Sequence, residues 1–435
     1  MSNFRLLADS ISNKSATIGV IGLGYVGLPL SLAFADAGYK VIGFDINDDR
    51  VRKLNSQISY IDQIKSSSIA KASSQGFSAT SDFSLISSIN VIILCVPTPL
   101  TLYREPDLQP IKSTLVNISR FLSDYQLLIL ESTTYPGTCD EVLYPFLKSA
   151  GFQVGSNFYL SYSPERVDPG NTTHTLAEIP KVVGGYSQNC LELSLLLYKS
   201  IVPSVIPVSS LRAAEMTKLL ENIHRCVNIG LVNEMKIVAD KMGIDIHEVV
   251  RAASTKPFGF TPYFPGPGLG GHCIPIDPFY LTWKAREFNI HTRFIELAGE
   301  VNTSMPDWVI SKVSYALNSK CLSINSSKIL ILGLSYKKDV DDIRESPAVA
   351  LLQKLSSSGA ILSYSDPYIS SFLDPLSGKS YISSHLYPDF LSSQDLVLIA
   401  TNHSSFDYNL ILNHSSTIVD TRGVYDSNLP NIIAA

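Results

Sequence analysis

The residue with the clearest chemical use is Cys273, in the segment F-P-G-P-G-L-G-G-H-C-I-P-I-D-P-F-Y-L-T-W at residues 264–283. Glycine has no Cβ, so this backbone can approach a bound molecule closely, while proline fixes the φ angles of the loop. Pro275 and Pro278 prevent an ordinary helix from running through the segment, so we expect Cys273 to lie at a rigid turn. A thiol held in this way can act as a nucleophile. An inert cysteine at a structural turn is the alternative.

Three polar residues follow apolar runs that are typical of buried strands. Thr98 comes after a strand expected over residues 90–96, Thr133 after one over 127–130, and Glu165 after one over 157–162. Because ligands gather at the carboxyl ends of strands in an open α/β sheet, these three are candidate site residues. An ordinary role in a turn or a helix cap is the alternative.

The first part of the chain has the pattern of a dinucleotide-binding unit. A predicted strand over residues 17–21 is followed by G-x-G-x-x-G, a predicted helix over 28–37 and a second strand over 40–44 that ends at Asp45. The fingerprint glycines are Gly22, Gly24 and Gly27. They let a pyrophosphate approach the helix N-terminus, whose free N–H groups favour an anion. Asp45 would accept hydrogen bonds from the ribose hydroxyls and would repel a 2′-phosphate, so we expect NAD rather than NADP.

The last third begins again as an α/β unit, with predicted strands over residues 327–332, 361–364, 396–401 and 417–419. Its first turn has Gly333 but lacks the other two fingerprint glycines, so a dinucleotide would fit badly there. A mononucleotide diphosphate held by Lys337 and Arg422 is more plausible, because both side chains pair with phosphate. Ordinary surface charges are the alternative.

The middle of the chain is predicted to be helical. One helix is expected over residues 213–242 and another over 293–318, interrupted near Pro306. Lys218 and Asn222 are four residues apart in the first helix and therefore share one of its faces. Two long helices between two α/β units indicate a connecting domain, which often also provides a dimer interface.

Composition excludes several classes of protein. The chain of 435 residues is 45% apolar and 17% charged, which suits a globular protein of two or three domains. Its net charge of −5 argues against a partner that is a nucleic acid or a membrane surface. Six scattered cysteines without a C-x-x-C pair predict reduced thiols and no metal site. We expect a cytoplasmic protein, because no targeting or membrane-spanning segment is evident. The serine-rich stretch over residues 65–88 is expected to be solvated surface.

Seven motifs together resemble the UDP-sugar 6-dehydrogenases of the UDP-glucose/GDP-mannose dehydrogenase family. They occur in the family's order between about residues 17 and 425: G-L-G-Y-V-G-L-P-L, P-T-P, E-S-T-x-x-P-G-T, S-P-E-R, E-x-x-K-L-x-E-N, G-G-H-C-I-P-x-D-P and D-D-I-R-E-S-P. The resemblance implies an α/β fold with two Rossmann-like doubly wound domains joined by a helical dimerisation domain. We expect NAD binding in residues 1–208, the helical domain with the cysteine loop in 209–322, and UDP-sugar binding in 323–435. A homodimer or higher homo-oligomer is implied.

The resemblance also implies a four-electron oxidation of the sugar's primary alcohol to a carboxylate with two NAD. Cys273 would form a thiohemiacetal, whose oxidation gives a thioester that water hydrolyses. Lys218 would stabilise the developing oxyanion with Asn222 beside it. Asp277 would activate water or accept a proton, Glu165 would assist hydrolysis, and Thr133 would hold the water.

The remaining family positions are contacts with the two ligands. The implied cofactor contacts are Gly22, Gly24, Tyr25, Val26, Gly27, Asp45, Arg50, Pro97, Thr98, Thr133 and Arg344. The implied substrate contacts are Glu165, Arg166, Lys218, Asn222, Phe264, Gly268, Gly270, Tyr336, Lys337 and Arg422.

The identity of the sugar depends on finer motif differences. UDP-glucose dehydrogenases usually have G-G-S-C-F-x-K-D around the nucleophile, whereas this chain has G-G-H-C-I-P-I-D. With E-S-T-T-Y-P-G, this form resembles the branch acting on UDP-N-acetylhexosamines, particularly UDP-N-acetylglucosamine. UDP-glucose, UDP-N-acetylmannosamine and UDP-N-acetylgalactosamine are the alternatives. His272 would contact the sugar or serve in packing. A two-electron dehydrogenase of the 6-phosphogluconate or hydroxyacid type, or a non-catalytic nucleotide-sugar sensor, would be functions of a different class.

Overall fold

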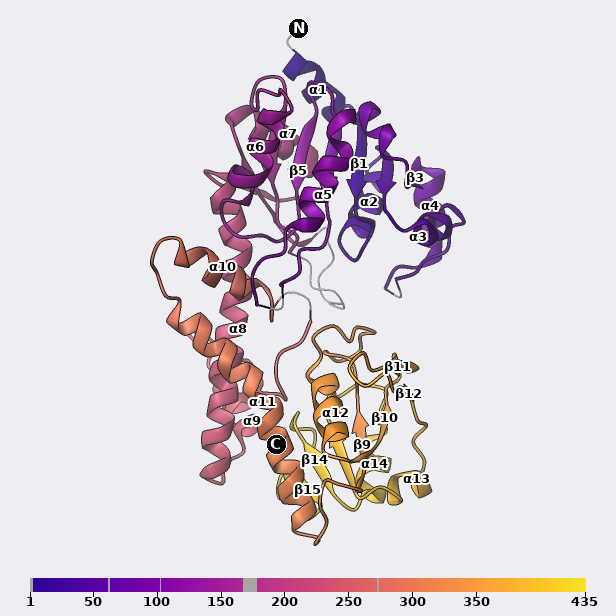
Figure 1. Ribbon diagram of the computed structural model, residues 1–435, viewed down its shortest axis with the longest axis vertical. Coiled ribbons are helices and arrows are strands. Elements are labelled where there is room, and N and C mark those ends of the chain that lie inside the picture. The colour runs from indigo at the N-terminus through magenta and orange to yellow at the C-terminus, as the bar shows by residue number, and fades with distance from the viewer. Residues whose placement is uncertain (1–2, 62, 102, 167–177, 272–273) are drawn as a thin grey trace. The chain divides into compact units, whose positions relative to one another are not determined.

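A computed structural model describes residues 3–61, 63–101, 103–166, 178–271 and 274–435. Two compact units make up the chain: Met1–Glu221 with Phe279–Ile290, and Asn222–Pro278 with His291–Ala435. We call them unit 1 and unit 2. Figure 1 shows a sheet with helices in each, unit 1 largely in indigo and magenta and unit 2 largely in orange and yellow.

Unit 1 is built on an eight-stranded sheet whose spatial order is β3-β2-β1-β4-β5-β6-β7-β8. The strands are β1 (Thr17–Ile21), β2 (Lys40–Phe44), β3 (Phe77–Thr80), β4 (Val91–Leu94), β5 (Leu127–Leu130), β6 (Tyr159–Tyr162), β7 (Lys181–Gly185) and β8 (Val205–Pro207). Neighbouring strands are parallel except β6 and β7, which are antiparallel. The order of the first six strands is that of the Rossmann fold, with the switch point between β1 and β4.

Helices pack against this sheet. The helices of unit 1 include α1 (Asn3–Ser12), α2 (Gly27–Asp36), α3 (Asp48–Asn55), α4 (Ser66–Ser74), α5 (Gln109–Ile118), α6 (Tyr144–Ser149) and α7 (Gln188–Tyr198). Alternate residues of β1, β2, β4 and β5 form one core with α1, α2, α4 and α7. β4 and β5 are buried at every position. Strands covered on both faces read as continuous apolar runs, which is why the sequence predicted them well.

The expectation of solvated surface over residues 65–88 is wrong in part. This stretch contains α4, β3 and the 3₁₀ helix η1 (Phe83–Ser88). Ile69, Ala72 and Phe77 are buried in the core of unit 1, while most of the serines remain exposed. The apolar residues were too few and too widely spaced to reveal the two elements.

Unit 2 contains a five-stranded parallel sheet in the order β10-β9-β13-β14-β15, a doubly wound order. Its strands are β9 (Lys328–Leu332), β10 (Ile361–Ser365), β13 (Leu396–Ile399), β14 (Ile418–Asp420) and β15 (Ile432–Ala434), beside the hairpin β11 (Ser371–Leu373) and β12 (Ser380–Ile382). One face packs against α12 (Pro347–Ser357) and α11 (Arg293–Asn318). The other packs against α13 (Pro388–Ser392) and α14 (Tyr408–His414). The predicted pair of Rossmann-like sheets is confirmed.

The predicted long helices are α8 (Leu211–Lys241) and α11, and shorter helices are α9 (Ile246–Ala253) and α10 (Asp277–Arg286). Contrary to expectation, Pro306 lies inside α11 without ending it. The residues around Pro306 are buried, and the helix continues into the core that it shares with the sheet, which offsets the hydrogen bond that proline removes. Gly230 of α8 faces Ala298 of α11, where an added Cβ would lie 3.2 Å from the Ala298 Cα. A side chain there would separate the two helices.

The predicted boundaries near residues 208 and 322 fall in the segments between β8 and α8 and between α11 and β9. The division into three domains stays a prediction. Among the helices of the described ranges, none combines the length and the apolar character needed to cross a bilayer.

Candidate active site

The three fingerprint glycines of unit 1 have different steric roles. Gly22 has φ +94°, and a Cβ there would lie 2.6 Å from the Cys95 carbonyl oxygen. A Cβ at Gly27 would lie 1.9 Å from the Gly22 carbonyl oxygen, so α2 could not begin so close to β1. A Cβ at Gly24 would meet no protein atom within 4 Å. Only Gly24 faces open space, which is the condition for a pyrophosphate to approach the start of α2.

Asp45 lies at the end of β2 and is buried. Its carboxylate accepts hydrogen bonds from the backbone N–H groups of Leu23, at 3.0 Å, and Asn47, at 2.9 Å. The half-exposed Arg50 places Nη1 3.6 Å from Asp45 Oδ2, and its guanidinium lies over the Tyr60 ring. These bonds fix the carboxylate at the edge of the fingerprint turn, and a carboxylate has enough lone pairs to accept ribose hydroxyls as well.

A hydrogen bond between two predicted site residues joins the loop after β4 to the loop after β5. The Thr98 hydroxyl donates to the Thr133 carbonyl oxygen at 2.7 Å, and the Tyr280 hydroxyl donates to the Thr98 carbonyl oxygen at 2.6 Å. Tyr280 belongs to the part of α10 that lies in unit 1, where Lys284 also pairs with Glu141. The structure therefore brings Thr98 and Thr133 together, as their positions at strand ends indicated.

Glu165, after β6, belongs to a buried charge network that sequence reasoning missed. Lys181 Nζ lies 3.1 Å from Glu165 Oε2 and 2.7 Å from Glu131 Oε2, and the Tyr198 hydroxyl donates to Glu131. Burial alone would lower the pKa of Lys181, but Glu131 and Glu165 together raise it above its usual value. The contact with Lys181 holds the Glu165 carboxylate at the carboxyl edge of the sheet.

Lys218 is positioned by the residue one turn before it in α8. Glu215 is fully buried and accepts the backbone N–H groups of Gly137, at 2.6 Å, and Cys139, at 3.0 Å. Burial raises the pKa of Glu215, while those amides oppose the shift. The bonds tie the start of α8 to the loop that carries Thr133. Lys218 itself is buried, with 5% of its surface exposed.

Arg166 is held away from open solvent by protein groups. Its Nη2 lies 2.6 Å from Glu221 Oε1, and its Nη1 donates to the Pro180 carbonyl oxygen at 2.6 Å. Nothing in these contacts gives Arg166 a free edge for a substrate.

In unit 2, Asn222 and Asp277 are hydrogen-bonded to each other. The Asn222 side-chain amide donates to the Asp277 carboxylate, and Arg225 donates to the Asn222 oxygen. Both Asn222 and Asp277 are buried. Asp277 is the first residue of α10 and follows the cysteine loop. Cys273 and His272 lie outside the described residues.

The glycines of the cysteine loop fit closely against the C-terminal sheet. A Cβ at Gly270 would lie 2.6 Å from Tyr336 Cβ, and one at Gly271 would lie 2.8 Å from Tyr336 Cε2. The Gly271 N–H donates to the Arg344 carbonyl oxygen at 3.0 Å. The expected use of these glycines was close approach to a ligand, but their immediate neighbour is Tyr336. Gly268 lies in the same loop with φ +138°.

The Asp366 carboxylate occupies the turn that follows β9, the first strand of the C-terminal sheet. Asp366 Oδ2 accepts the backbone N–H groups of Leu334, at 2.7 Å, and Ser335, at 3.0 Å, and pairs with His403 at 3.1 Å. Burial alone would raise the pKa of Asp366, but these bonds lower it to about 2. Asp45 makes the equivalent contact with Leu23 in unit 1, so the two turns differ in their glycines and not in this hydrogen bond.

Arg422 lies just beyond β14, and its Nε donates to the Ala400 carbonyl oxygen at 2.7 Å. Its Nη1 would lie 2.7 Å from a Cβ at Gly266, so the guanidinium packs directly on the cysteine loop. Phe264 is half-exposed and stacks on His247, with ring centroids 6.2 Å apart. Lys337 is half-buried and Arg344 pairs with Asp342. Phe264, Gly266 and Arg422 therefore form one surface in unit 2.

Most thiols of the described residues are unsuited to reaction. No disulfide joins them; Cys139, Cys190 and Cys226 are buried, Cys95 is partly buried, and Cys321 is exposed. Burial raises the pKa of Cys95 and Cys139 well above the usual value, and that of Cys226 to about 11.

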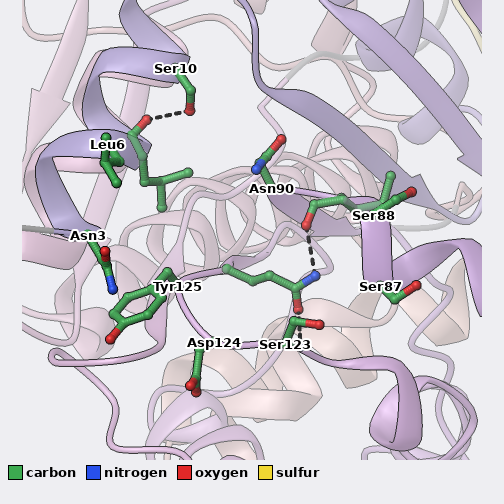
Figure 2. A pocket seen from close by; sticks show the side chains of 12 residues that line it. Asn3, Leu6, Ser10, Ser87, Ser88, Asn90, Ser123, Asp124 and Tyr125 are labelled. Carbon is green, nitrogen blue, oxygen red and sulfur yellow. Dashed lines mark hydrogen bonds between the residues drawn. The ribbon is translucent and has the colours of Figure 1, made fainter.

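A separate cavity of about 340 Å³ lies in unit 1 at the opposite ends of the strands (Figure 2). Its lining includes Asn3, Ser10, Asn90, Asp124 and Tyr125, from α1 and from the segments that precede β4 and β5. The buried Gln126 donates to the carbonyl oxygens of Ile86 and Ile89. The site residues lie at the other edge of this sheet, so we assign no function to this cavity.

The Rossmann strand order, the open space at Gly24 and the acidic residue after β2 are those of a dinucleotide-binding domain. The UDP-glucose/GDP-mannose dehydrogenase family models match over three segments: the NAD-binding domain at residues 16–202, the central domain at 212–304 and the UDP-binding domain at 330–427. The chain belongs to this family. It is an NAD-dependent nucleotide-sugar dehydrogenase.

Relatives and solved structures of similar sequence cover most of the chain. UDP-N-acetyl-D-glucosamine 6-dehydrogenase of Pseudomonas aeruginosa is 35% identical over 82% of this chain and 84% of its own length. Protein CapL of Staphylococcus aureus is 33% identical over 95% of this chain and 97% of its own. The structure of the UDP-D-ManNAc dehydrogenase of Pyrococcus horikoshii superposes with a TM-score of 0.87 at 30% identity, covering 96% of this chain and 98% of that one.

The pairing of Asp45 with Arg50 predicts a change in cofactor preference for Asp45→Asn. The loss of charged hydrogen bonds to the ribose should lower kcat/KM with NAD by about 10- to 100-fold. NADP should be used better, because Arg50 loses its counter-charge and becomes available to a 2′-phosphate. Steady-state kinetics with both cofactors measures the ratio. Adding Arg50→Ala should remove the gain with NADP, and an unchanged ratio in Asp45→Asn would contradict the assignment.

Proposed function

We propose that this protein oxidises the 6-hydroxymethyl group of a UDP-N-acetylhexosamine to the uronic acid, with UDP-N-acetylglucosamine as the preferred substrate. The main support is the buried hydrogen bond between Asn222 and Asp277, which places a carboxylate and an amide at the base of the loop carrying Cys273. Surface polysaccharide precursor synthesis is the use that we infer for such a product.

The reaction needs a nucleophile because a four-electron oxidation passes through an aldehyde. Bound NAD would accept one hydride in each of two oxidations. We assign to Cys273 the attack on the aldehyde carbon, which gives a thiohemiacetal with a C–S bond and a hydroxyl. Loss of hydride and of the hydroxyl proton gives a thioester. Attack by water then breaks the C–S bond, releases the carboxylate and returns the thiol.

Polar groups of the described residues supply the remaining roles. Lys218, buried and fixed through Glu215, would stabilise the oxyanion, with Asn222 as a second donor. Asp277 would accept the proton from the alcohol or from water. Glu165, paired with Lys181, would assist hydrolysis, and Thr133 would hold the water.

The ligand contacts that we propose divide between the two sheets. The residues assigned to NAD in unit 1 are Gly22, Gly24, Tyr25, Val26, Gly27, Asp45, Arg50, Pro97, Thr98 and Thr133, to which we add Arg344. UDP would be held by Lys337 and Arg422 as charge partners, with Phe264, Gly268, Gly270 and Tyr336 around it. Arg166 is the weakest of the substrate assignments, because its guanidinium is already paired with Glu221.

The thioester route predicts two NADH for each UDP-sugar consumed, measured with the sugar limiting and the product identified by mass. Cys273→Ala should form no acid while still binding UDP and NAD. One NADH with a stable aldehyde or ketone would indicate a two-electron dehydrogenase instead. A complete lack of NADH from wild type with every UDP-sugar would indicate a nucleotide-sugar sensor, and full turnover by Cys273→Ala would rule out the covalent route.

The choice of an N-acetylated sugar is supported by G-G-H-C-I-P-I-D and by the named activities of the relatives, which include enzymes for UDP-N-acetylglucosamine and for UDP-N-acetylmannosamine. UDP-N-acetylglucosamine and UDP-N-acetylmannosamine carry the same acetamido group and differ only in configuration at C2. A site shaped for that group should lose roughly 1–3 kcal/mol when a hydroxyl replaces it, because its methyl pocket and amide partners are left unfilled.

We therefore expect kcat/KM for UDP-N-acetylglucosamine to exceed that for UDP-glucose by about ten- to two-hundredfold. Parallel assays under saturating NAD with UDP-N-acetylmannosamine and UDP-N-acetylgalactosamine test the epimers. A higher kcat/KM for the manno epimer would move the assignment to that substrate, and a preference for UDP-glucose would overturn the acetamido pocket. Neither result would change the assigned chemistry of Cys273.

We also propose that the protein is a homodimer or higher homo-oligomer formed through α8. Leu231, Met235 and Val238 are exposed and lie on one face of this helix at spacings of four and three residues, and the exposed Met242, just beyond the helix end, follows four residues later. A continuous apolar stripe on a long helix is typical of a surface that another helix covers. The same helix from a second copy would match it by symmetry.

The double substitution Leu231→Glu with Met235→Glu should convert the oligomer to a monomer, because it places like charges on both copies of the stripe. Light scattering after gel filtration gives the mass directly. Ser311→Glu is the control, since it adds a carboxylate at an exposed position of α11. An unchanged oligomer in the double variant, or a monomeric wild type, would contradict the assignment of this face.

A further inference from the structure

Lys236 is a buried lysine of unit 2 whose side chain has few polar partners. It lies on α8 with 4% of its surface exposed. Its Nζ donates one long hydrogen bond, 3.4 Å, to the carbonyl oxygen of Thr421, the residue before Arg422. Among the described residues it forms no ion pair. An ammonium group has three donors and is costly to bury unless they are satisfied, so two of its donors remain to be used.

The two carboxylates nearest Lys236 are already committed elsewhere. Asp240, one turn later in α8, pairs with Lys312 of α11. Asp420 of β14 accepts the backbone N–H groups of Arg422, at 2.8 Å, Val424, at 2.6 Å, and Tyr425, at 2.9 Å. Neither is placed to neutralise the ammonium group fully.

A second cation and a histidine complete the surroundings of Lys236. Arg422 projects from the same loop as Thr421 toward Gly266, and the His247 ring of α9 packs against Gly423, where an added Cβ would lie 2.4 Å from its Cγ. We call Lys236, His247, Asp420 and Arg422 the basic cluster. It brings two basic side chains, Lys236 and Arg422, to the loop after β14, with Asp420 as its acidic member.

The electrostatics of the basic cluster favour a neutral Lys236 in the free protein. Burial, followed by the like charge of Arg422 and opposed by Asp420 and Asp240, lowers the pKa of Lys236 to about 7. Burial and Lys236 also lower the pKa of His247, which is therefore neutral above pH 7. An anion added beside Arg422 would favour the charged form of the lysine.

We propose that Lys236 is a positioning residue for the nucleotide, taking up one proton from solvent when the diphosphate of UDP binds at Arg422. The inference rests on the proposed function, which assigns Arg422 to the diphosphate. The proton goes to Nζ, and the resulting ammonium supplies the second charge that the diphosphate needs. The protein thus avoids holding two buried cations side by side until the anion arrives.

Calorimetric titration of the whole protein with UDP tests the inference. Measurements at pH 8 in phosphate and in Tris, which differ in heat of ionisation, give the number of protons taken up. Wild type should take up about one proton per UDP, and its Kd should rise about tenfold from pH 8 to pH 9. Uridine, which lacks the anion, should cause no uptake.

Variants assign the proton to Lys236. Lys236→Met should bind UDP with no proton uptake and a Kd that hardly changes between pH 8 and pH 9. Lys320→Met, the loss of an exposed lysine elsewhere in unit 2, and His247→Gln, the loss of the other proton acceptor, should both take up protons as wild type does. NAD binding in unit 1 reports that each variant is folded.

The possible results distinguish a failure of this inference from a failure of the proposed function. Wild type that binds UDP without proton uptake, or Lys236→Met that retains the uptake, overturns the role of Lys236 and leaves the UDP-sugar activity standing. Loss of the uptake in His247→Gln alone assigns the proton to the histidine and also overturns it. Failure of folded wild type to bind UDP at all contradicts the proposed function itself.

Discussion

The contact between the cysteine loop and Tyr336 constrains the rest of unit 2. Gly270 and Gly271 approach the Tyr336 ring more closely than any side chain would allow, and a backbone hydrogen bond from Gly271 to Arg344 closes the contact. The same loop meets Arg422 at Gly266. Because a Cβ at any of these glycines would push the loop away, its path is fixed by the C-terminal sheet. The position of Asp277, which follows the loop, depends on that path.

The buried lysines Lys181 of unit 1 and Lys236 of unit 2 have different surroundings. Lys181 is enclosed by Glu131 and Glu165, and each partner is satisfied inside the protein. Lys236 is equally buried, but within the part of the chain that the structure describes it donates a hydrogen bond to a carbonyl oxygen and forms no ion pair. Breaking a buried pair is costly, so the first arrangement is a stable support for Glu165. The surroundings of Lys236 are stable only when this lysine is uncharged or when an anion lies nearby. This property is expected of a ligand-binding site whose ligand is an anion.

Much of the fold could be predicted because its signals are local. β1, β2 and β5 have the predicted bounds, since a parallel strand buried on both faces is an apolar run with polar ends. The meeting of Thr98 with Thr133 followed from strand ends that share one sheet edge. The short elements α4 and β3 contain too few apolar residues for their spacing to predict a helix and a strand. Glu131, Lys181, Glu215 and Lys236 were missed because their partners come from distant parts of the chain, and nothing near them in the sequence marks a lysine or a glutamate as buried.

The interior thiols have a consequence for covalent chemistry. A thiol reacts with an electrophile as the thiolate, and burial keeps Cys95, Cys139 and Cys226 in the neutral form at physiological pH. Of the cysteines in the described ranges, Cys321 alone is exposed. A mild alkylating reagent would therefore modify very few positions on the native protein. If Cys273 has the role proposed for it, a warhead attached to a UDP scaffold would encounter little competition from these thiols.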